Sequence, residues 1–170
     1  MEIAQLIIEA LKFIFPAYCA NAIPVIAGGG QPIDRGRKFS DGKPIFGSNK
    51  TIRGFFSGLI VGTAVGLAEG AFFPEYRTQA LSFGFLLSLG ALLGDLTGAF
   101  IKRRLGIAPG GLLPVVDQVD FIIGAILFSL LLSLPFMSPE LIITVLVITI
   151  PIHVLTNFVA YKLKLKDRPW

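Results

Sequence analysis

The feature that most constrains the fold is a series of five apolar stretches, each close to the length of a membrane-spanning helix. They are Ile3 to Ala27, Phe55 to Phe73, Ala80 to Ile101, Phe121 to Phe136 and Leu141 to Tyr161. A helix needs about 20 apolar residues to cross the roughly 30 Å of hydrocarbon in a bilayer. Only 15% of the residues are charged, against about 25% in soluble domains. We therefore predict an all-α integral membrane protein with five transmembrane helices in a single domain, residues 1–170.

The distribution of lysine and arginine predicts the topology. These residues gather between the first two stretches, directly after the third at Lys102 to Arg104, and after the fifth between Lys162 and Arg168. Positively charged loops stay in the cytoplasm, so we expect the N-terminus outside and the C-terminus in the cytoplasm. For most of these lysines and arginines, a role in setting the membrane topology is a sufficient explanation. Glu9 and Lys12, one helical turn apart in the first stretch, are expected to form an ion pair.

Asp95 is the only charged residue between Ala80 and Ile101. An acid inside a bilayer-length segment costs roughly 2.5–3.5 kcal/mol on insertion scales, so it indicates a function. Asp117 and Asp120 lie three residues apart, on one face of a fourth helix that we expect to begin at Asp117. Converging carboxylates repel one another unless a cation is present, and their hard oxygens suit Mg²⁺. The alternative is that Asp117 and Asp120 cap their helix while Asp95 pairs with Lys102.

The segment Gly47 to Gly54 runs directly into the second apolar stretch. Ser48 or Asn49 is placed to cap that helix, whose first amides and dipole favour an anion. Lys50 and Arg53, one turn apart, would converge on the same phosphate groups. Taken alone, the motif is weak evidence for a phosphate site, because a capped helix with juxtamembrane bases is common.

Lys102 and Arg103 add positive charge at the same membrane edge, beside a loop, Gly106 to Pro114, that is suited to cover a ligand. Together these residues predict a nucleoside triphosphate site in which metal ions bridge the reacting phosphate. A phosphate monoester is mostly a dianion at neutral pH, so it needs no catalytic histidine as a base. His153 is therefore expected to be packed or hydrogen-bonded.

Glycines recur at four-residue spacing in two of the stretches. One stripe runs from Gly54 to Gly70 and the other from Gly90 to Gly98. Small residues let helices approach closely in lipid. We expect a tight pair of helices that holds Asp95 rigidly.

Several of these motifs resemble the archaeal CDP-archaeol synthase family, over nearly the whole chain from Pro16. They are Pro16-Ala17-Tyr18 with Ala20-Asn21 and Pro24, Gly28-Gly29-Gly30 with Pro32-Ile33-Asp34, Asn49 to Gly54, Gly94-Asp95, Ile101 to Gly106, and Leu113-Pro114 with Asp117 to Phe121. The C-terminal signature of bacterial CDP-diacylglycerol synthases is more distantly similar. That pattern usually has a His-Gly-Gly segment before its acids, an arginine at the position of Gln118 and a glutamate at that of Arg53.

The resemblance implies a magnesium-dependent cytidylyltransferase domain that uses CTP and an isoprenoid ether lipid phosphate, 2,3-bis-geranylgeranylglycerol 1-phosphate. It assigns metal binding to Asp95, Asp117 and Asp120, and catalysis to these acids with Lys50 and Arg53. It assigns nucleotide and phosphate binding to Ser48, Asn49, Lys50, Thr51, Arg53, Lys102 and Arg103. Asn21 and Asn157 either orient ligands or bond between helices.

The resemblance also implies a multi-pass protein of the cell membrane with its active site facing the cytoplasm. Membrane lipids are expected partners, nucleic acid is not, and the sequence leaves open whether the protein forms a homodimer. Two rival functions remain: a CTP-dependent polyprenol kinase, which needs a general base near the metal, and a small transporter that uses Asp95 as a proton or ion site. A CDP-alcohol phosphotransferase is excluded, because its Asp-Gly-x-x-Ala-Arg motif is absent at Asp41-Gly42.

Overall fold

The computed structural model describes residues 2–132 and 137–169 of the chain. The α-helices are α1 (Ile3–Ala27), α2 (Ile52–Phe72), α3 (Ala80–Arg104), α4 (Val116–Ser129) and α5 (Pro139–Lys162), with short 3₁₀ helices η1 (Pro74–Gln79) and η2 (Leu130–Leu132). Over the described residues there is no β-strand, and β pairing is limited to two isolated bridges, Pro32 with Thr51 and Lys38 with Pro44. The all-α prediction is confirmed.

Four helical segments have the length and apolar composition of membrane spans. They are α1, α2, η1 continued by α3, and α5. Helix α4 has 14 residues, which at 1.5 Å per residue gives about 21 Å, less than the thickness of the hydrocarbon core. It begins at Val116, next to the expected start at Asp117, but the described residues do not confirm a fifth span. Residues 133–136 of the fourth predicted stretch lie outside them.

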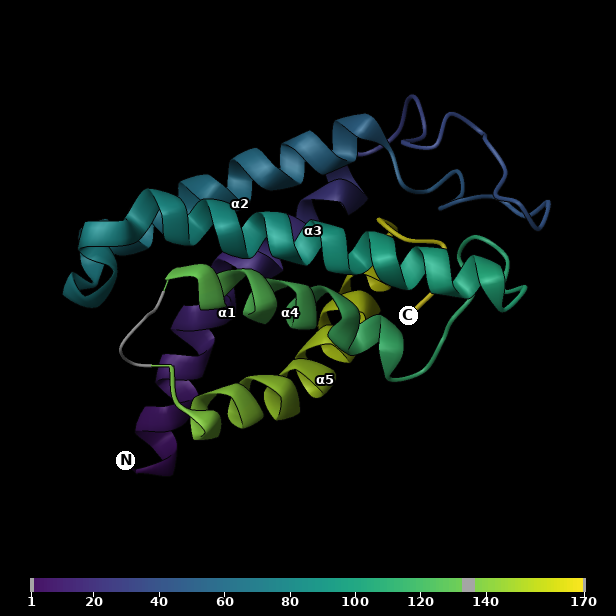
Figure 1. Ribbon diagram of the computed structural model, residues 1–170. Coiled ribbons are helices and arrows are strands. Elements are labelled where there is room, and N and C mark those ends of the chain that lie inside the picture. Colours follow the sequence, from purple (N-terminus) through teal and green to yellow (C-terminus); the bar gives the residue numbers. More distant parts are fainter. Residues whose placement is uncertain (1, 133–136, 170) are drawn as a thin grey trace.

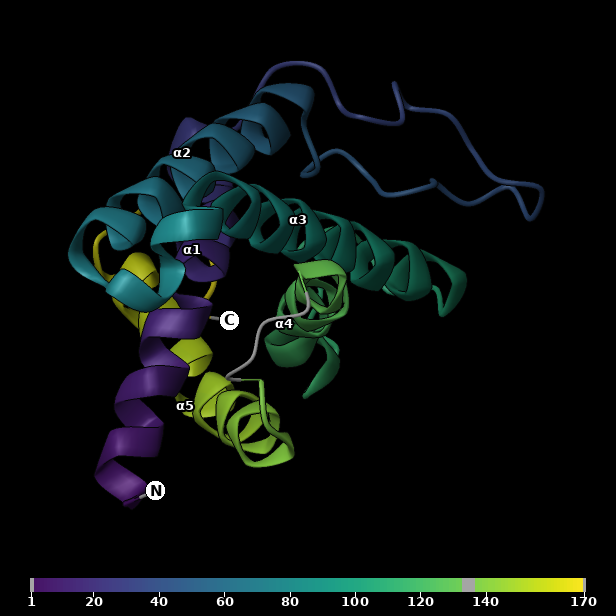
Figure 2. The ribbon, with the colours of Figure 1, turned by 60° about the vertical axis from the view of Figure 1, so that its left-hand side comes forward.

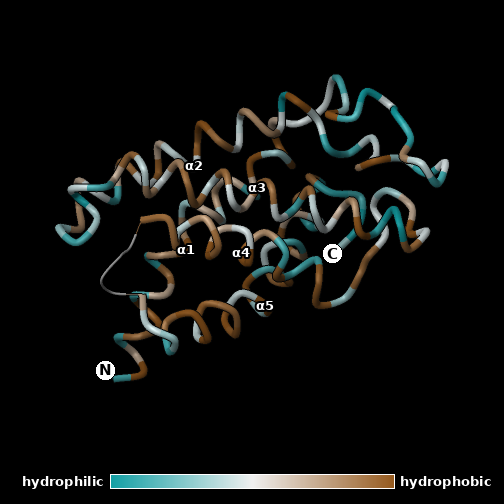
Figure 3. Tube along the Cα trace, viewed as in Figure 1, coloured by the Kyte–Doolittle hydropathy of each residue, from teal (hydrophilic) through white to brown (hydrophobic). Residues whose placement is uncertain are grey.

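The polar connections gather at one end of the bundle. The segment between α1 and α2, the loop between α3 and α4, and the C-terminus lie at this end, whereas the N-terminus and η1 lie toward the other (Figure 1). The segment between α1 and α2 extends well beyond the helices (Figure 2). Hydrophilic residues concentrate in these connections and around η1, while the helices are largely hydrophobic (Figure 3). The three basic segments thus share one end, as the topology prediction requires, and the orientation of this end toward the cytoplasm stays a prediction.

The packed core lies among α1, α3 and α4. Phe13, Phe83 and Phe121 are fully buried there with smaller aliphatic side chains around them. Helix α5 leaves large apolar side chains such as Val147 and Leu155 exposed, with 62% and 61% of their surface accessible. Apolar side chains that point outward along a hydrophobic helix are typical of contact with lipid.

The two glycine stripes have different partners. In α2, Gly58 and Gly62 lie against Ala20 and Pro16 of α1, and Gly66 lies against Gly84 of α3.

The stripe of α3 instead faces α4. A Cβ added at Gly90 would lie 2.8 Å from the backbone carbon of Gly124, and one at Gly94 would lie 3.0 Å from that of Asp120. Real Cβ atoms do not approach other atoms within 3.0 Å. The closely packed pair that holds the predicted acids is therefore α3 with α4.

The expected ion pair in α1 is confirmed at the end of the bundle that holds η1. Lys12 Nζ lies 2.9 Å from Glu9 Oε1 and 3.3 Å from Glu75 Oε1. The second contact joins α1 to η1.

Candidate active site

A cavity of about 740 Å³ opens at the polar end of the bundle, between the helices and the connecting segments. Its volume lies in the range of small-molecule sites, about 300–1,000 Å³. Nine of the ten residues predicted for the site line it: Ser48, Asn49, Lys50, Thr51, Asp95, Lys102, Arg103, Asp117 and Asp120. Residues from three separate segments of the chain thus meet in one space.

Two ion pairs connect the walls of the cavity. Lys50 Nζ lies 2.6 Å from each carboxylate oxygen of Asp95, which joins the α1–α2 segment to α3. Lys102 Nζ lies 2.8 Å from Asp117 Oδ1, which joins α3 to α4. The alternative pairing of Asp95 with Lys102 is therefore not observed. Each pair places a cation and an acid at the cavity surface, where phosphate and metal can compete for them.

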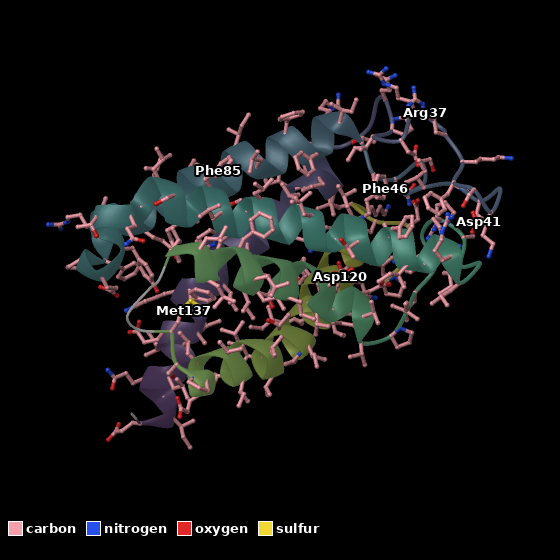
Figure 4. The ribbon with its side chains drawn as sticks, in the orientation of Figure 1. Arg37, Asp41, Phe46, Phe85, Asp120 and Met137 are labelled. Carbon is pink, nitrogen blue, oxygen red and sulfur yellow. The ribbon has the colours of Figure 1, made fainter. Side chains whose placement is uncertain are left out.

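Asp120 lies at the contact between α3 and α4 (Figure 4). Its Oδ1 accepts a hydrogen bond of 2.6 Å from the Phe121 amide. Only a glycine fits opposite its carboxylate, because a Cβ at Gly98 would overlap Asp120 Oδ2 and lie 2.8 Å from Cγ. The close helix packing therefore fixes the direction of this carboxylate.

The carboxylates have the chemistry of a magnesium site, although Asp95 and Asp117 are at present paired with lysines. Asp95, Asp117 and Asp120 reach one cavity from two helices, and carboxylate oxygens together with phosphates and water are usual Mg²⁺ ligands. Among residues 2–132 and 137–169, no three His, Cys, Asp or Glu side chains are grouped closely enough to hold an ion as they stand. The ammonium groups of Lys50 and Lys102 supply the positive charge that these acids require. The donor set therefore fits a metal that arrives with the phosphates of a substrate.

Arg103 offers the clearest place for an anion. Its side chain is buried, and Nη2 donates to the Ala108 carbonyl at 3.2 Å. Among residues 2–132 and 137–169, its Nε and Nη1 find no hydrogen-bond partner. A buried donor without a partner costs about 1–3 kcal/mol, and more when it is charged. An anion that reached these buried atoms would satisfy them.

The segment between α1 and α2 is anchored by Asp34, which is named from the sequence only as part of a family motif, without a role. Its carboxylate accepts hydrogen bonds from the amides of Gly36, Phe46 and Gly47 at 3.0, 2.9 and 2.9 Å. Burial acts to raise the pKa of Asp34, but these hydrogen bonds to backbone amides outweigh it and hold the pKa below its usual value. The turn that leads into Ser48 and Asn49 is thereby ordered.

The helix cap differs from the prediction. Thr51, not Ser48 or Asn49, caps α2, and its Oγ1 accepts from the Gly54 amide at 3.1 Å. The reason is that the backbone stays extended at Thr51, where it pairs with Pro32, so the helix begins only at Ile52. Ser48 and Asn49 instead line the cavity.

Arg53 does not converge with Lys50. Its Nε donates to the Ala27 carbonyl at 2.9 Å and its Nη2 to the Gly28 carbonyl. Lys50 precedes the helix, so the one-turn spacing that would align the two residues does not apply. Within the described part of the chain Arg53 is outside the cavity lining, and its role in phosphate binding stays a prediction.

A third wall of the cavity comes from α5 and the tail that follows it. His153, Asn157 and Lys166 line it. Asn157 Nδ2 lies 3.1 Å from His153 Nδ1, and the His153 ring packs 5.7 Å from that of Phe121, so the expected packed and hydrogen-bonded histidine is confirmed. The sequence offered no periodic signal that the tail returns to the site, and Lys166 was interpreted only as a topology signal.

A bundle of lipid-facing helices that encloses acids and cations in a cavity at one end fits an integral membrane enzyme that acts on phosphorylated substrates. A family model described as CarS-like CDP-archaeol synthase matches residues 3–170. The chain belongs to the CDP-archaeol synthase family. The prediction of an enzyme of the lipid-phosphate cytidylyltransferase class, which works in the membrane in phospholipid biosynthesis, is thereby confirmed.

Individual relatives match over almost their full length. The CDP-archaeol synthase of Pyrococcus furiosus is 47% identical, over 96% of this chain and 98% of the relative. That of Methanocaldococcus jannaschii is 41% identical, over 98% of each. A solved structure, described as an intramembrane enzyme for archaeal membrane lipid biosynthesis, superposes with a TM-score of 0.82 at 36% identity, covering 89% of this chain and 94% of that one.

Proposed function

We propose that this protein transfers CMP from CTP to 2,3-bis-O-geranylgeranylglycerol 1-phosphate, giving unsaturated CDP-archaeol and pyrophosphate at the cytoplasmic face of the membrane. The observation that carries the proposal is the cavity in which Lys50, Lys102 and Arg103 face Asp95, Asp117 and Asp120. Three cationic side chains can bind the triphosphate of a nucleotide together with the phosphate group of a second substrate. Family membership supports the choice of lipid.

The reaction is one substitution at phosphorus. An oxygen of the lipid phosphate attacks the α-phosphorus of CTP, a new P–O–P link forms, and the bond from the α-phosphorus to the leaving pyrophosphate breaks. The attacking phosphate is already mostly a dianion at neutral pH, so the protein has to position it rather than deprotonate it. Positioning and charge neutralisation supply most of the catalysis in such transfers.

The residues divide this work between them. Arg103 offers its two unpartnered nitrogens to phosphate oxygens, and Lys50 and Lys102 exchange their carboxylate partners for phosphate when substrate enters. The carboxylates that they release, together with Asp120, would hold Mg²⁺. When bound, the metal neutralises the negative charge that develops on the reacting phosphates. Ser48 and Asn49 line the cavity and would contact the nucleotide.

Pyrophosphate release by the purified protein in detergent tests this function. The assay contains CTP and Mg²⁺, with the geranylgeranyl ether phosphate present or omitted, and release is expected only when all three are present. Asp95→Asn is expected to lower turnover at least 100-fold while the protein stays folded. Asp41→Asn is the matched control, since Asp41 pairs with Arg104 in the exposed part of the loop.

Other products would contradict the proposal. Formation of CDP with a phosphorylated lipid would indicate a kinase. Absence of both pyrophosphate and CDP, with ion movement in proteoliposomes that depends on Asp95, would indicate a transporter.

A further inference from the structure

We propose that the ring of Phe46, in the segment between α1 and α2, stacks on the nucleobase of the substrate nucleotide in the active-site cavity. This inference rests on the proposed function and deepens it, because the charged residues of the site account only for the phosphates and the metal. Phe46 is outside the motifs that assign residues to the site. The structure places it in the cavity lining.

The backbone of Phe46 is fixed beside the cavity. Its amide donates to Asp34 Oδ2 at 2.9 Å, and the Gly47 amide donates to the same oxygen at 2.9 Å. The chain turns at Gly47, where φ is +101°, and a Cβ at this glycine would lie 3.1 Å from Cγ of Pro109 in the α3–α4 loop. The point from which the ring projects is thus set before a ligand arrives, which lowers the entropic cost of binding.

The ring of Phe46 has a face available to a ligand. The side chain is partly exposed and lines the cavity, and within the described part of the chain no other aromatic ring pairs with it. Phe55, which also lines the cavity, pairs instead with Phe56, with ring centroids 5.7 Å apart. Figure 4 shows Phe46 on the side of its segment toward α3. An aromatic face at the wall of a polar cavity is the surface on which nucleobases stack.

The phosphate-binding part of the site begins one residue away. A Cβ at Gly47 would lie 3.5 Å from Nη1 of Arg103, which lines the cavity. Ser48, Asn49 and Lys50 follow in the chain and line the same space. A nucleotide with its phosphates at Arg103 and Lys50 therefore has its base within reach of the Phe46 ring.

The location of Phe46 favours the nucleotide over the lipid as its ligand. The segment between α1 and α2 is largely hydrophilic and lies at the polar end of the bundle (Figure 3). The apolar side chains of Leu92 and Leu96 line the cavity from the membrane-embedded part of α3, where the isoprenoid chains would lie. A nucleobase has a flat apolar face and polar edges, so it suits a single ring among polar neighbours.

Steady-state kinetics in the pyrophosphate assay test the inference. Phe46→Ala is expected to raise the KM for CTP about 5- to 150-fold, the range that loss of base–aromatic stacking gives. The base is remote from the reacting phosphorus, so its stacking is equal in the ground and transition states, and kcat and the KM for the lipid should not change. Phe46→Trp should keep the affinity for CTP. Phe46→Leu, which has an apolar side chain without an aromatic face, should resemble Phe46→Ala.

Phe39→Ala is the matched control. It removes the same ring from the same segment, at an exposed side chain that packs against Phe100 with ring centroids 5.3 Å apart, and it should leave the KM for CTP unchanged. An equal rise in Phe39→Ala would show that the order of the segment, and not stacking, determines the affinity, and would overturn the inference. Full affinity for CTP in Phe46→Leu, or a rise in the KM for the lipid alone in Phe46→Ala, would also overturn it.

A binding measurement separates this inference from the proposed function. The double variant Phe46→Trp/Trp170→Phe has a single tryptophan, because Trp170 is the only one in the chain. In the absence of lipid, CTP with Mg²⁺ should quench its fluorescence by stacking, whereas inorganic triphosphate, which has no base, should not. Equal quenching by the two compounds, or none by CTP at concentrations that saturate pyrophosphate release, would overturn the inference. A wild-type protein that releases no pyrophosphate would instead refute the proposed function, and quenching by CTP alone would still support stacking.

Discussion

Substitution of Gly98 by alanine would test whether the close packing of α3 on α4 positions Asp120. The new methyl group would overlap Asp120 Oδ2 and lie 2.8 Å from Cγ, where ordinary contacts begin at 3.4 Å. The carboxylate must therefore shift by on the order of 1 Å, and a misplacement of this size lowers rates by about 100-fold. We expect Gly98→Ala to lower kcat/KM for pyrophosphate release by about that factor, although no charged residue is changed.

The effect on stability should be small by comparison. Replacing glycine by alanine inside a helix contributes roughly 0.8–1.0 kcal/mol to stability, which offsets part of the 1–3 kcal/mol typical of overpacking. Thermal unfolding in detergent, followed by circular dichroism, measures this directly.

Gly70→Ala provides the matched control for Gly98→Ala. Its Cβ would overlap that of Ala80 at the far end of α2, so it should lower the unfolding temperature and leave kcat/KM of the folded fraction unchanged. If Gly98→Ala is folded and as active as the wild type, Asp120 does not need the position that α3 gives it. In that case the assignment of Asp120 to the reacting centre is wrong.

Three further predictions concern the loop, the bases and the metal. Asp34→Asn should destabilise the protein by roughly 1–3 kcal/mol at pH 7. The pKa of Asp34 is depressed in the folded protein. The stability that its carboxylate contributes is therefore fully present above the unfolded pKa near 3.9 and is lost as the pH falls through the folded pKa. The thermal unfolding temperatures of the wild type and Asp34→Asn should accordingly converge only below about pH 4. Lys50→Ala should lower kcat/KM at least tenfold more than Arg53→Ala, since only Lys50 lines the cavity; equal losses would place Arg53 on a phosphate. Chelation of divalent ions should abolish pyrophosphate release and added Mg²⁺ restore it, and release that persists in chelator would remove the metal from Asp95, Asp117 and Asp120.

The sequence predicted the long helices well, because apolar length is a strong signal. The predicted stretches for α1, α2, α3 and α5 agree with the observed helices to within a few residues. Helix α4 was located correctly at its start, where its acids stand, and its role as a fifth span stays a prediction. A 14-residue helix in a bundle is determined by its packing against α3, and the apolar pattern does not report that.

The site was predicted where it rests on regular helices. Asp95 and Lys102 on α3, and Asp117 and Asp120 on α4, follow helical geometry, so their sequence spacing places them correctly along one edge. The prediction for Lys50 and Arg53 assumed that the helix already includes Lys50, whereas the pairing of Thr51 with Pro32 keeps this backbone extended. Lys166 depends on a short turn after α5, for which hydrophobic periodicity gives no information.

The depth of Asp95 in the bundle determines how the lipid substrate can reach the site. Asp95 lies seven residues from Lys102 along α3, about 10 Å of helix rise, so the cavity reaches from the aqueous end of the bundle into the apolar zone. The isoprenoid lipid proposed as the substrate would not have to leave the bilayer to bring its headgroup to this level. The rate at which the lipid reaches the enzyme then depends on its lateral diffusion in the membrane plane and on its surface density in the membrane. Diluting the lipid with inert detergent, at constant amounts of lipid and protein, should therefore slow the reaction.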